Sequence, residues 1–131
     1  MKVAVIGSRT FADYVVLKDY LDRLNAMREI SRIISGGAAG ADRLGERWAE
    51  ENKVEKLVFE AKWDDLTHSD ALIKVNSRGK QYDARAGFRR NKDIIEAADV
   101  VIAFWDGSSR GTKDGIDHAG KIGKPIKIIR F

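Results

Sequence analysis

The chain has 131 residues, 44% of them hydrophobic, which is the usual size and composition of one domain with a single core. It has no cysteine, which excludes disulfides, zinc–thiolate sites and a thiol nucleophile. Its 24 basic and 20 acidic residues give a net charge of +4, an excess that attracts phosphates without identifying a nucleic-acid-binding protein. No segment is long and apolar enough for a signal or a membrane span, so we expect one domain over residues 1–131, located in the cytoplasm, with no membrane partner.

Apolar runs alternate with amphipathic segments along the chain. The first half predicts a strand at residues 3–7, a helix at 14–28, a strand at 32–35, a helix at 40–52 and a strand at 56–59. Residues 60–84 lack clean periodicity and are our candidate for a lid. The second half predicts a helix at 86–98, a strand at 99–104, a helix at 111–122 that ends at Gly123, and a strand at 125–129. This alternation predicts an α/β fold, a Rossmann-like three-layer sandwich with a five-stranded parallel sheet in the order 3-2-1-4-5.

Three turns that contain glycine follow predicted strands. They are Ile6-Gly7-Ser8-Arg9-Thr10, Ser35-Gly36-Gly37-Ala38-Ala39-Gly40-Ala41-Asp42 and Trp105-Asp106-Gly107-Ser108-Ser109-Arg110-Gly111-Thr112. A strand that breaks into glycines before a helix presents free amides and the positive end of the helix dipole to an anion, most often a phosphate. We therefore expect the unpaired amides of Gly7, Gly36 and Gly111 to converge on one cavity at the switch point of the sheet.

Four motifs run almost from end to end of the chain. In chain order they are Val5-Ile6-Gly7-Ser8-Arg9, the segment from Ser35 to Asp42 with Trp48-Ala49 in the next helix, Ala86-Gly87-Phe88-Arg89-Arg90-Asn91, and Ala103-Phe104-Trp105-Asp106-Gly107 with Gly111-Thr112. Their order and spacing resemble the SLOG superfamily, in particular its YspA-like branch, which is related to LOG phosphoribohydrolases and to the DprA/Smf DNA-processing fold. Residues 64–84 are the poorest match.

The resemblance implies a Rossmann-like domain that binds a nucleotide or a nucleotide-derived phosphorylated ligand. The ligand contacts that it implies are Gly7, Ser8, Arg9, Gly36, Gly37, Asp42, Arg89, Asn91, Gly111 and Thr112. SLOG proteins often assemble as dimers, so the resemblance also leaves a homodimer open. LOG enzymes carry a catalytic glutamate in a PGGxGTxxE motif, whereas here Asp114 is followed by Gly115, which argues against LOG-type hydrolysis.

Two arginines at the start of the third predicted helix have different expected roles. If this helix begins near Ala86, Arg89 lies in its first turn and faces the crevice, where a guanidinium can bind a phosphate or carboxylate with two hydrogen bonds. The alternative for Arg89 is a position on the solvated face of the helix. For Arg90 we expect that solvated face.

Two residues after the fourth predicted strand and one in the aperiodic segment could also contact a ligand. Asp106 could bond a ribose hydroxyl or act as a general base, or it could form an Asx turn with Gly107. Trp105 could stack on a base or close the upper edge of the core, and Trp63 is the better candidate for stacking, whereas Trp48 is expected in the core.

Three functions follow from these patterns. The first is a sensor or processing module that binds a nucleotide-derived ligand in a crevice at the carboxyl ends of the strands. The alternative is an N-glycosidic bond hydrolase or transferase acting on nucleoside monophosphates, like LOG proteins or deoxyribosyltransferases, with Asp106, Asp114 or Asp117 as acid, base or nucleophile. The second alternative is single-stranded DNA binding, as in DprA-like proteins, by basic residues around Arg85 to Lys92 and near the C-terminus.

No structural metal and no cofactor is expected, because the 2 histidines lack ligand spacing, and Mg²⁺ bridging Asp side chains and ligand phosphates stays open.

Overall fold

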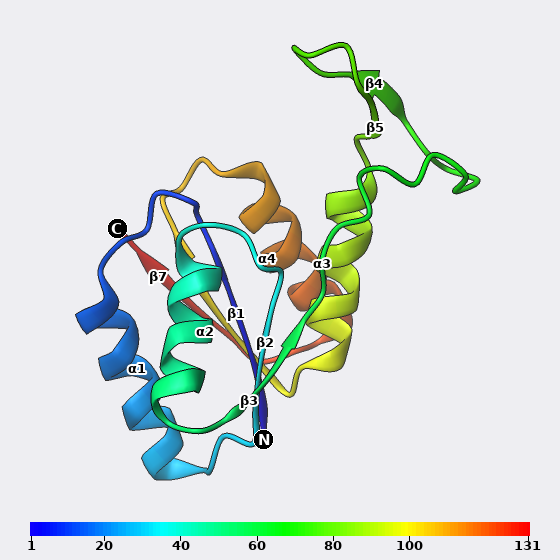
Figure 1. Ribbon diagram of the computed structural model, residues 1–131. Helices are drawn as coiled ribbons and strands as arrows, with labels where there is room; N and C mark the ends of the chain where they lie inside the picture. The colour runs from blue at the N-terminus through cyan, green and yellow to red at the C-terminus, as the bar shows by residue number, and fades with distance from the viewer.

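The computed structural model describes residues 1–131 and contains one sheet of five parallel strands (Figure 1). The strands of this sheet are β1 (Lys2–Gly7), β2 (Arg32–Ser35), β3 (Glu55–Val58), β6 (Val100–Trp105) and β7 (Ile126–Arg130). They lie in the order β3-β2-β1-β6-β7, and every neighbouring pair is parallel. The order differs from the predicted 3-2-1-4-5 in numbering alone, because two strands of a separate hairpin precede β6 in the chain.

Two pairs of helices cover the two faces of the sheet (Figure 1). One face is covered by α1 (Tyr14–Met27) and α2 (Ala41–Glu51), and the other by α3 (Ala86–Ala97) and α4 (Arg110–Ile122). Helix α1 begins after Asp13, whose carboxylate accepts a hydrogen bond from the backbone N of Val16 at 3.2 Å. Helix α4 ends as predicted at Gly123, which has a left-handed φ of 75°.

The sheet divides the apolar core into two layers. Along β1, Val3 and Val5 pack toward α1 and α2, whereas Ala4 and Ile6 pack toward α3 and α4. This alternation is that of a strand buried on both faces, as a parallel sheet covered by helices requires. Trp48 of α2 is fully buried, which confirms its expected place in the core. None of the helices has the length and apolar character that crossing a membrane would need.

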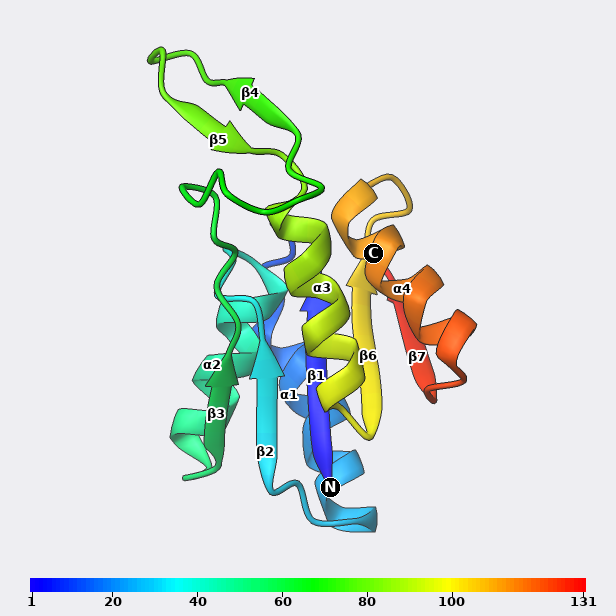
Figure 2. The ribbon, with the colours of Figure 1, turned by 90° about the vertical axis from the view of Figure 1, so that its right-hand side faces the viewer.

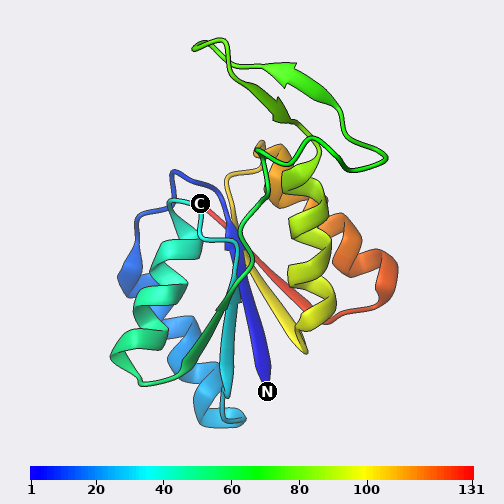
Figure 3. The ribbon, with the colours of Figure 1, turned by 45° about the vertical axis from the view of Figure 1, so that its right-hand side comes forward.

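Residues 64–84 form an arm that projects beyond the carboxyl ends of the strands (Figures 2 and 3). The arm contains two short antiparallel strands, β4 (Ile73–Val75) and β5 (Gln81–Asp83), which pair with no strand of the main sheet. The sequence did not predict this hairpin within residues 60–84, and the role of the segment as a lid stays a prediction. Strands of three residues are too short for alternation to identify them in a sequence.

Candidate ligand-binding site

The three glycine turns lie at the carboxyl edge of the sheet, around adjoining cavities. Gly7 at the end of β1 and Gly111 in the first turn of α4 line a cavity of about 110 Å³. Gly36, which follows β2, lines a second cavity of about 250 Å³. Both cavities are also lined by Arg9, Ala38 and Arg90, so the turns border one region of the surface.

A third cavity of about 170 Å³ adjoins the first two and has aromatic walls. Trp63 and Phe88 line it, and it shares Arg9 and Arg90 with both other cavities. Trp63 packs on the first turn of α3, because a Cβ atom added at Gly87 would lie 2.8 Å from its ring. We call the three cavities together the crevice.

Two arginines without carboxylate partners occupy the centre of the crevice. Arg9 and Arg90 each line all three cavities, and neither takes part in an ion pair of this structure. Burial lowers the pKa of Arg90, the nearby Asp42 opposes this effect, and the guanidinium of Arg9 lowers the pKa further. Two neighbouring positive charges in a partly buried site favour the binding of an anion.

Arg90, rather than Arg89, faces the crevice. The Nη1 atom of Arg90 donates a hydrogen bond to the carbonyl oxygen of Gly36 at 2.7 Å. The guanidinium of Arg89 instead binds the carboxylates of Asp83 and Asp70, and Arg89 lines none of the three cavities. The expectation that Arg90 lies on the solvated face is therefore wrong.

The sequence contains the signal that separates these two arginines. Position 90 is four residues after the buried Ala86 and four residues before the buried Ile94, so it shares their face of the helix. Position 89 is rotated from that face by about 100°, the angle between successive helical residues. The register of the helix, more than its start, decides which guanidinium enters the crevice.

Gly36 is closely packed against two side chains that any Cβ atom would displace. A Cβ atom at this position would lie 2.6 Å from Nη1 of Arg90 and 2.9 Å from Oδ2 of Asp42. The amide of Gly36 donates to the same Oδ2 atom at 2.9 Å, and the amide of Ala38 donates to it at 3.4 Å. The prediction of an unpaired amide at Gly36 is therefore wrong, because Asp42 holds the turn in place from within the chain.

Asp42 is a buried carboxylate on the wall of the 110 Å³ cavity. It is 6% exposed, and burial raises its pKa to about 6 against the opposing hydrogen bonds from Gly36 and Ala38. It is the only acidic residue that lines this cavity. Its charge near neutral pH therefore depends on the pH and on what binds beside it.

Asn91, Thr112 and Gly37 also lie in the crevice, as the resemblance implies. Asn91 and Thr112 line the 110 Å³ cavity, and Gly37, with φ 70°, lines the 250 Å³ cavity. The side chain of Asn91 donates to the carbonyl oxygen of Gly111 at 3.2 Å, which ties α3 to the start of α4. These contacts fix the walls of the crevice around Arg90.

Ser8 and Trp105 line none of the three cavities. Ser8 is 2% exposed, and its Oγ accepts a hydrogen bond from the backbone N of Asp106 at 3.2 Å. The indole Nε1 of Trp105 donates to the carbonyl oxygen of Ser109 at 3.1 Å, and Arg130 lies 5.1 Å from the centre of its ring. Both side chains thus support the turn before α4.

The three candidate catalytic carboxylates, Asp106, Asp114 and Asp117, also lie outside these cavities. Asp106 accepts hydrogen bonds from the amides of Ser108 at 2.9 Å and Ser109 at 2.8 Å, and these bonds lower its pKa. This is the geometry of an Asx turn. Asp114 bonds Asn91 at 3.3 Å from outside the crevice, and Asp117 pairs with an exposed lysine on α4.

Sequence reasoning singled out Trp63 but missed Phe88, the other aromatic wall of the 170 Å³ cavity. Phe88 is 43% exposed in the first turn of α3, and an exposed aromatic residue beside a crevice is the signal that could have identified it.

No three His, Asp or Glu side chains gather as a ligand set for a metal ion. Mg²⁺ held partly by ligand phosphates stays a prediction.

Comparisons with known proteins give one family and one fold. The family model described as "YspA, cpYpsA-related SLOG family" matches residues 1–65. The Gene 61 protein of Mycobacterium phage D29 is 30% identical to this chain over an alignment of 132 positions, which spans 95% of this chain and 93% of that protein.

Two solved structures of DNA processing protein A (DprA) have a similar fold. The protein from Streptococcus pneumoniae gives a TM-score of 0.75 at 22% identity, over 99% of this chain and 50% of that chain. The protein from Helicobacter pylori gives 0.69 at 23% identity, over 98% of this chain and 64% of that chain. The chain thus spans less than two thirds of either DprA protein.

Proposed function

The chain belongs to the YspA, cpYpsA-related SLOG family, and from this premise we propose that its crevice binds a nucleotide or a nucleotide-derived phosphorylated ligand. The observation that carries the proposal is the pair Arg9 and Arg90, which line all three cavities and have no carboxylate partner. The phosphate lies between these guanidinium groups, beside Gly7 and Gly111. The N-terminus of α4 adds favourable electrostatics for a negative charge there.

The base of this ligand occupies the 170 Å³ cavity, between Trp63 and Phe88. Aromatic side chains bind bases of any sequence, because every base has a π-face. Arg9 and Arg90 line both this cavity and the one bordered by Gly7, so a single ligand can place its phosphate and its base on the two sides of them.

Thermal shift and calorimetry with adenosine monophosphate, adenosine and ribose 5-phosphate test this proposal. We expect the monophosphate to raise the melting temperature most, because it alone engages both the arginines and the aromatic walls. Arg9→Gln and Arg90→Gln each lower its affinity about tenfold or more, the usual effect of removing a charged hydrogen-bond donor. The matched control is Arg23→Gln on α1, where Arg23 is exposed and pairs with Asp19 at 3.0 Å.

Two results would contradict the proposal. One is a panel of nucleoside mono-, di- and triphosphates in which no member raises the melting temperature at millimolar concentration. The other is Arg9→Gln binding the monophosphate as tightly as Arg23→Gln. Arg9 is exposed and makes no side-chain hydrogen bond to the rest of the protein, so its substitution leaves the fold intact.

A second candidate function is single-stranded DNA binding, and the likeness of the fold to DprA favours it. The structure from Helicobacter pylori concerns the binding of single-stranded DNA by that protein. The same crevice suits one nucleotide of a strand as well as a free nucleotide. The two functions differ in whether affinity rises with the length of the ligand and falls steeply with salt.

A further inference from the structure

The arm, residues 64–84, has no role in the core of the protein. Its hairpin pairs with no strand of the main sheet, and Leu72, Ile73 and Val75 are each at least 42% exposed. An isolated two-stranded hairpin is marginally stable in water. Its position relative to the crevice must therefore be held by the contacts at its base.

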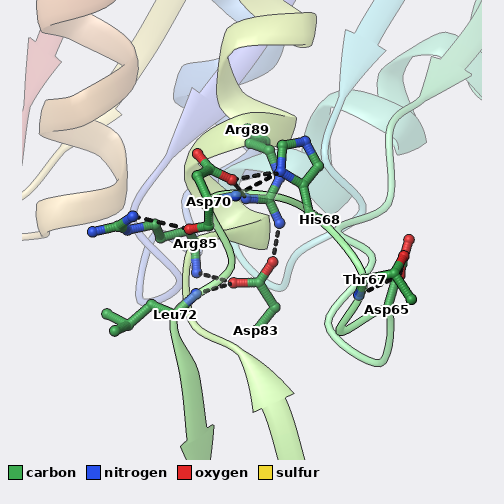
Figure 4. Close-up of polar contacts among 8 residues, drawn as sticks. All are labelled: Asp65, Thr67, His68, Asp70, Leu72, Asp83, Arg85 and Arg89. Carbon is green, nitrogen blue, oxygen red and sulfur yellow. Dashed lines mark hydrogen bonds and ion pairs between the residues drawn. The ribbon is translucent and has the colours of Figure 1, made fainter.

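A buried carboxylate holds the base of the arm (Figure 4). Asp83 is fully buried and accepts hydrogen bonds from the backbone N of Leu72 at 3.1 Å and of Arg85 at 2.9 Å, and from the guanidinium of Arg89. The same guanidinium binds Asp70 at 2.5 Å. Arg89 belongs to α3, so this network attaches both ends of the hairpin to a helix that borders the crevice.

The outer part of the arm is positively charged. Lys74, Arg78 and Lys80 lie within residues 71–82, and no acidic residue occurs in that range. Lys80 forms an exposed ion pair with Asp64 at 3.0 Å, whereas Lys74 and Arg78 are in no ion pair. Lys74 stands directly opposite Tyr82 in the β4–β5 ladder, so their side chains share one face of the hairpin.

This face continues from the crevice. The ring of Tyr82 meets the ring of Trp63 edge to face, with the ring centres 6.3 Å apart. Trp63 in turn lines two of the three cavities, each together with Arg90. Cationic and aromatic groups therefore follow one another from the centre of the crevice to the end of the arm.

We propose that this arm extends the crevice into a binding track for single-stranded nucleic acid. One nucleotide of the strand occupies the crevice, the next base stacks on Tyr82, and the following phosphates pair with Lys74, Arg78 and Lys80. An alternation of stacking surfaces and cations suits an unpaired strand, whose bases are free to stack. The inference rests on the proposed function for the nucleotide in the crevice, and it adds the surface that binds the rest of the strand.

Fluorescence anisotropy with a labelled 20-mer of thymidylate, written dT20, tests the arm directly. The arm variant carries Lys74→Gln, Arg78→Gln and Lys80→Gln. The control variant loses the same charge at exposed positions on α1 and α4, with Lys18→Gln, Arg23→Gln and Lys113→Gln. In each protein, the shift of melting temperature with thymidine monophosphate reports separately on the crevice.

We expect the wild-type protein to bind dT20 more tightly than the monophosphate, with a strong dependence on salt. The arm variant loses about tenfold or more of its affinity for dT20 relative to the control variant, and its salt slope falls by about 2, since each phosphate contact on a single strand contributes about 0.7. Tyr82→Ala alone weakens dT20 binding by about fivefold or more. The shift produced by the monophosphate is the same in the wild-type protein, the arm variant and the control variant.

Equal affinities and salt slopes for dT20 in the arm and control variants would overturn the inference. So would a 20-base-pair blunt duplex that binds as tightly as dT20 with the same dependence on the arm. Loss of the monophosphate shift in the wild-type protein, with arm-dependent dT20 binding retained, would contradict the proposed function and leave the arm as the binding surface. Circular dichroism of each variant controls for folding; the substituted lysines and arginines are exposed, and Tyr82 is half-buried.

Discussion

Replacing Asp42 by asparagine tests the electrostatics of the crevice without any ligand. The pKa of Asp42 rises from 3.8 to about 6 on folding, because the carboxyl group is buried. The folded protein therefore holds the proton more tightly than the unfolded chain does, and the free energy of unfolding falls as the pH rises from about 4 to about 6. At about 1.4 kcal/mol per pH unit, the ionised carboxylate destabilises the folded protein by about 3 kcal/mol above pH 7.

The Asp42→Asn variant removes this ionisation and keeps an oxygen that can accept from the amides of Gly36 and Ala38. Denaturant unfolding followed by tryptophan fluorescence, from pH 4 to pH 8, gives the free energy of unfolding of both proteins. We expect the difference, variant minus wild type, to rise by up to about 3 kcal/mol between pH 4 and pH 7 and then to level off. Asp83 and Asp106, whose pKa values are lowered, give slopes of the opposite sign, but they are present in both proteins and cancel in the difference.

Asp117→Asn is the matched control, because it removes an exposed carboxylate from a helix. A difference between Asp42→Asn and wild type that stays constant from pH 4 to pH 8, or that falls, would refute the reasoning. It would mean that Asp42 is ionised at little energetic cost beside Arg90.

Four further substitutions test the geometry of the site and of the arm. Gly36→Ala displaces the guanidinium of Arg90, so we expect it to lower the free energy of unfolding by about 1–3 kcal/mol and to weaken monophosphate binding. In Gly111→Ala no atom lies within 4 Å of the new Cβ, so this variant retains the stability of the wild type. Thermal melting of both variants checks this. Asp106→Ala removes the two hydrogen bonds that close the turn before α4, and we expect it to lower the free energy of unfolding at pH 7. Folding lowers the pKa of Asp106, so the wild type loses its advantage in stability over Asp106→Ala as the pH falls below about 4. An equal difference in stability between the two proteins at pH 7 and at pH 3 would contradict this prediction. Asp83→Asn weakens the attachment of the arm, and we expect trypsin to cleave within residues 66–82 about tenfold faster, with unchanged far-UV circular dichroism; equal cleavage rates would show that the anchor lies elsewhere.

The strands and helices of the sandwich could be predicted because burial on both faces leaves a clear pattern. The strand at 32–35 is confirmed at both ends, and each of the other predicted elements differs from the structure by one residue, either at one end, as in β1, or at both ends, as in β7. The hairpin could not be predicted, since it has no buried face and its alternation spans three residues on each strand. The sequence shows the basic composition of the hairpin but does not show that the hairpin is separate from the main sheet.

The candidate site was predicted in outline and missed in detail. The convergence of Gly7 and Gly111 follows from the strand order, which places β1 beside β6. The amide of Gly36 is paired because Asp42 turns back toward it, and no pattern of residue types distinguishes a carboxylate that faces a ligand from one that stabilises its own turn. Arg90 was missed because its charge suggested solvent, although its spacing from Ile94 indicated the buried face.

The two ends of the arm lie next to each other at its base. The amide of Asp83 donates to the carbonyl oxygen of Trp63 at 2.8 Å, and the amide of Ala84 donates to that of Leu72 at 2.8 Å. A hairpin closed at its root in this way can be lengthened, shortened or exchanged at its tip without moving the walls of the crevice. The length and composition of the arm can therefore change independently of the crevice. Another loop grafted between these paired amides would change which extended ligand the domain binds and leave its pocket unaltered.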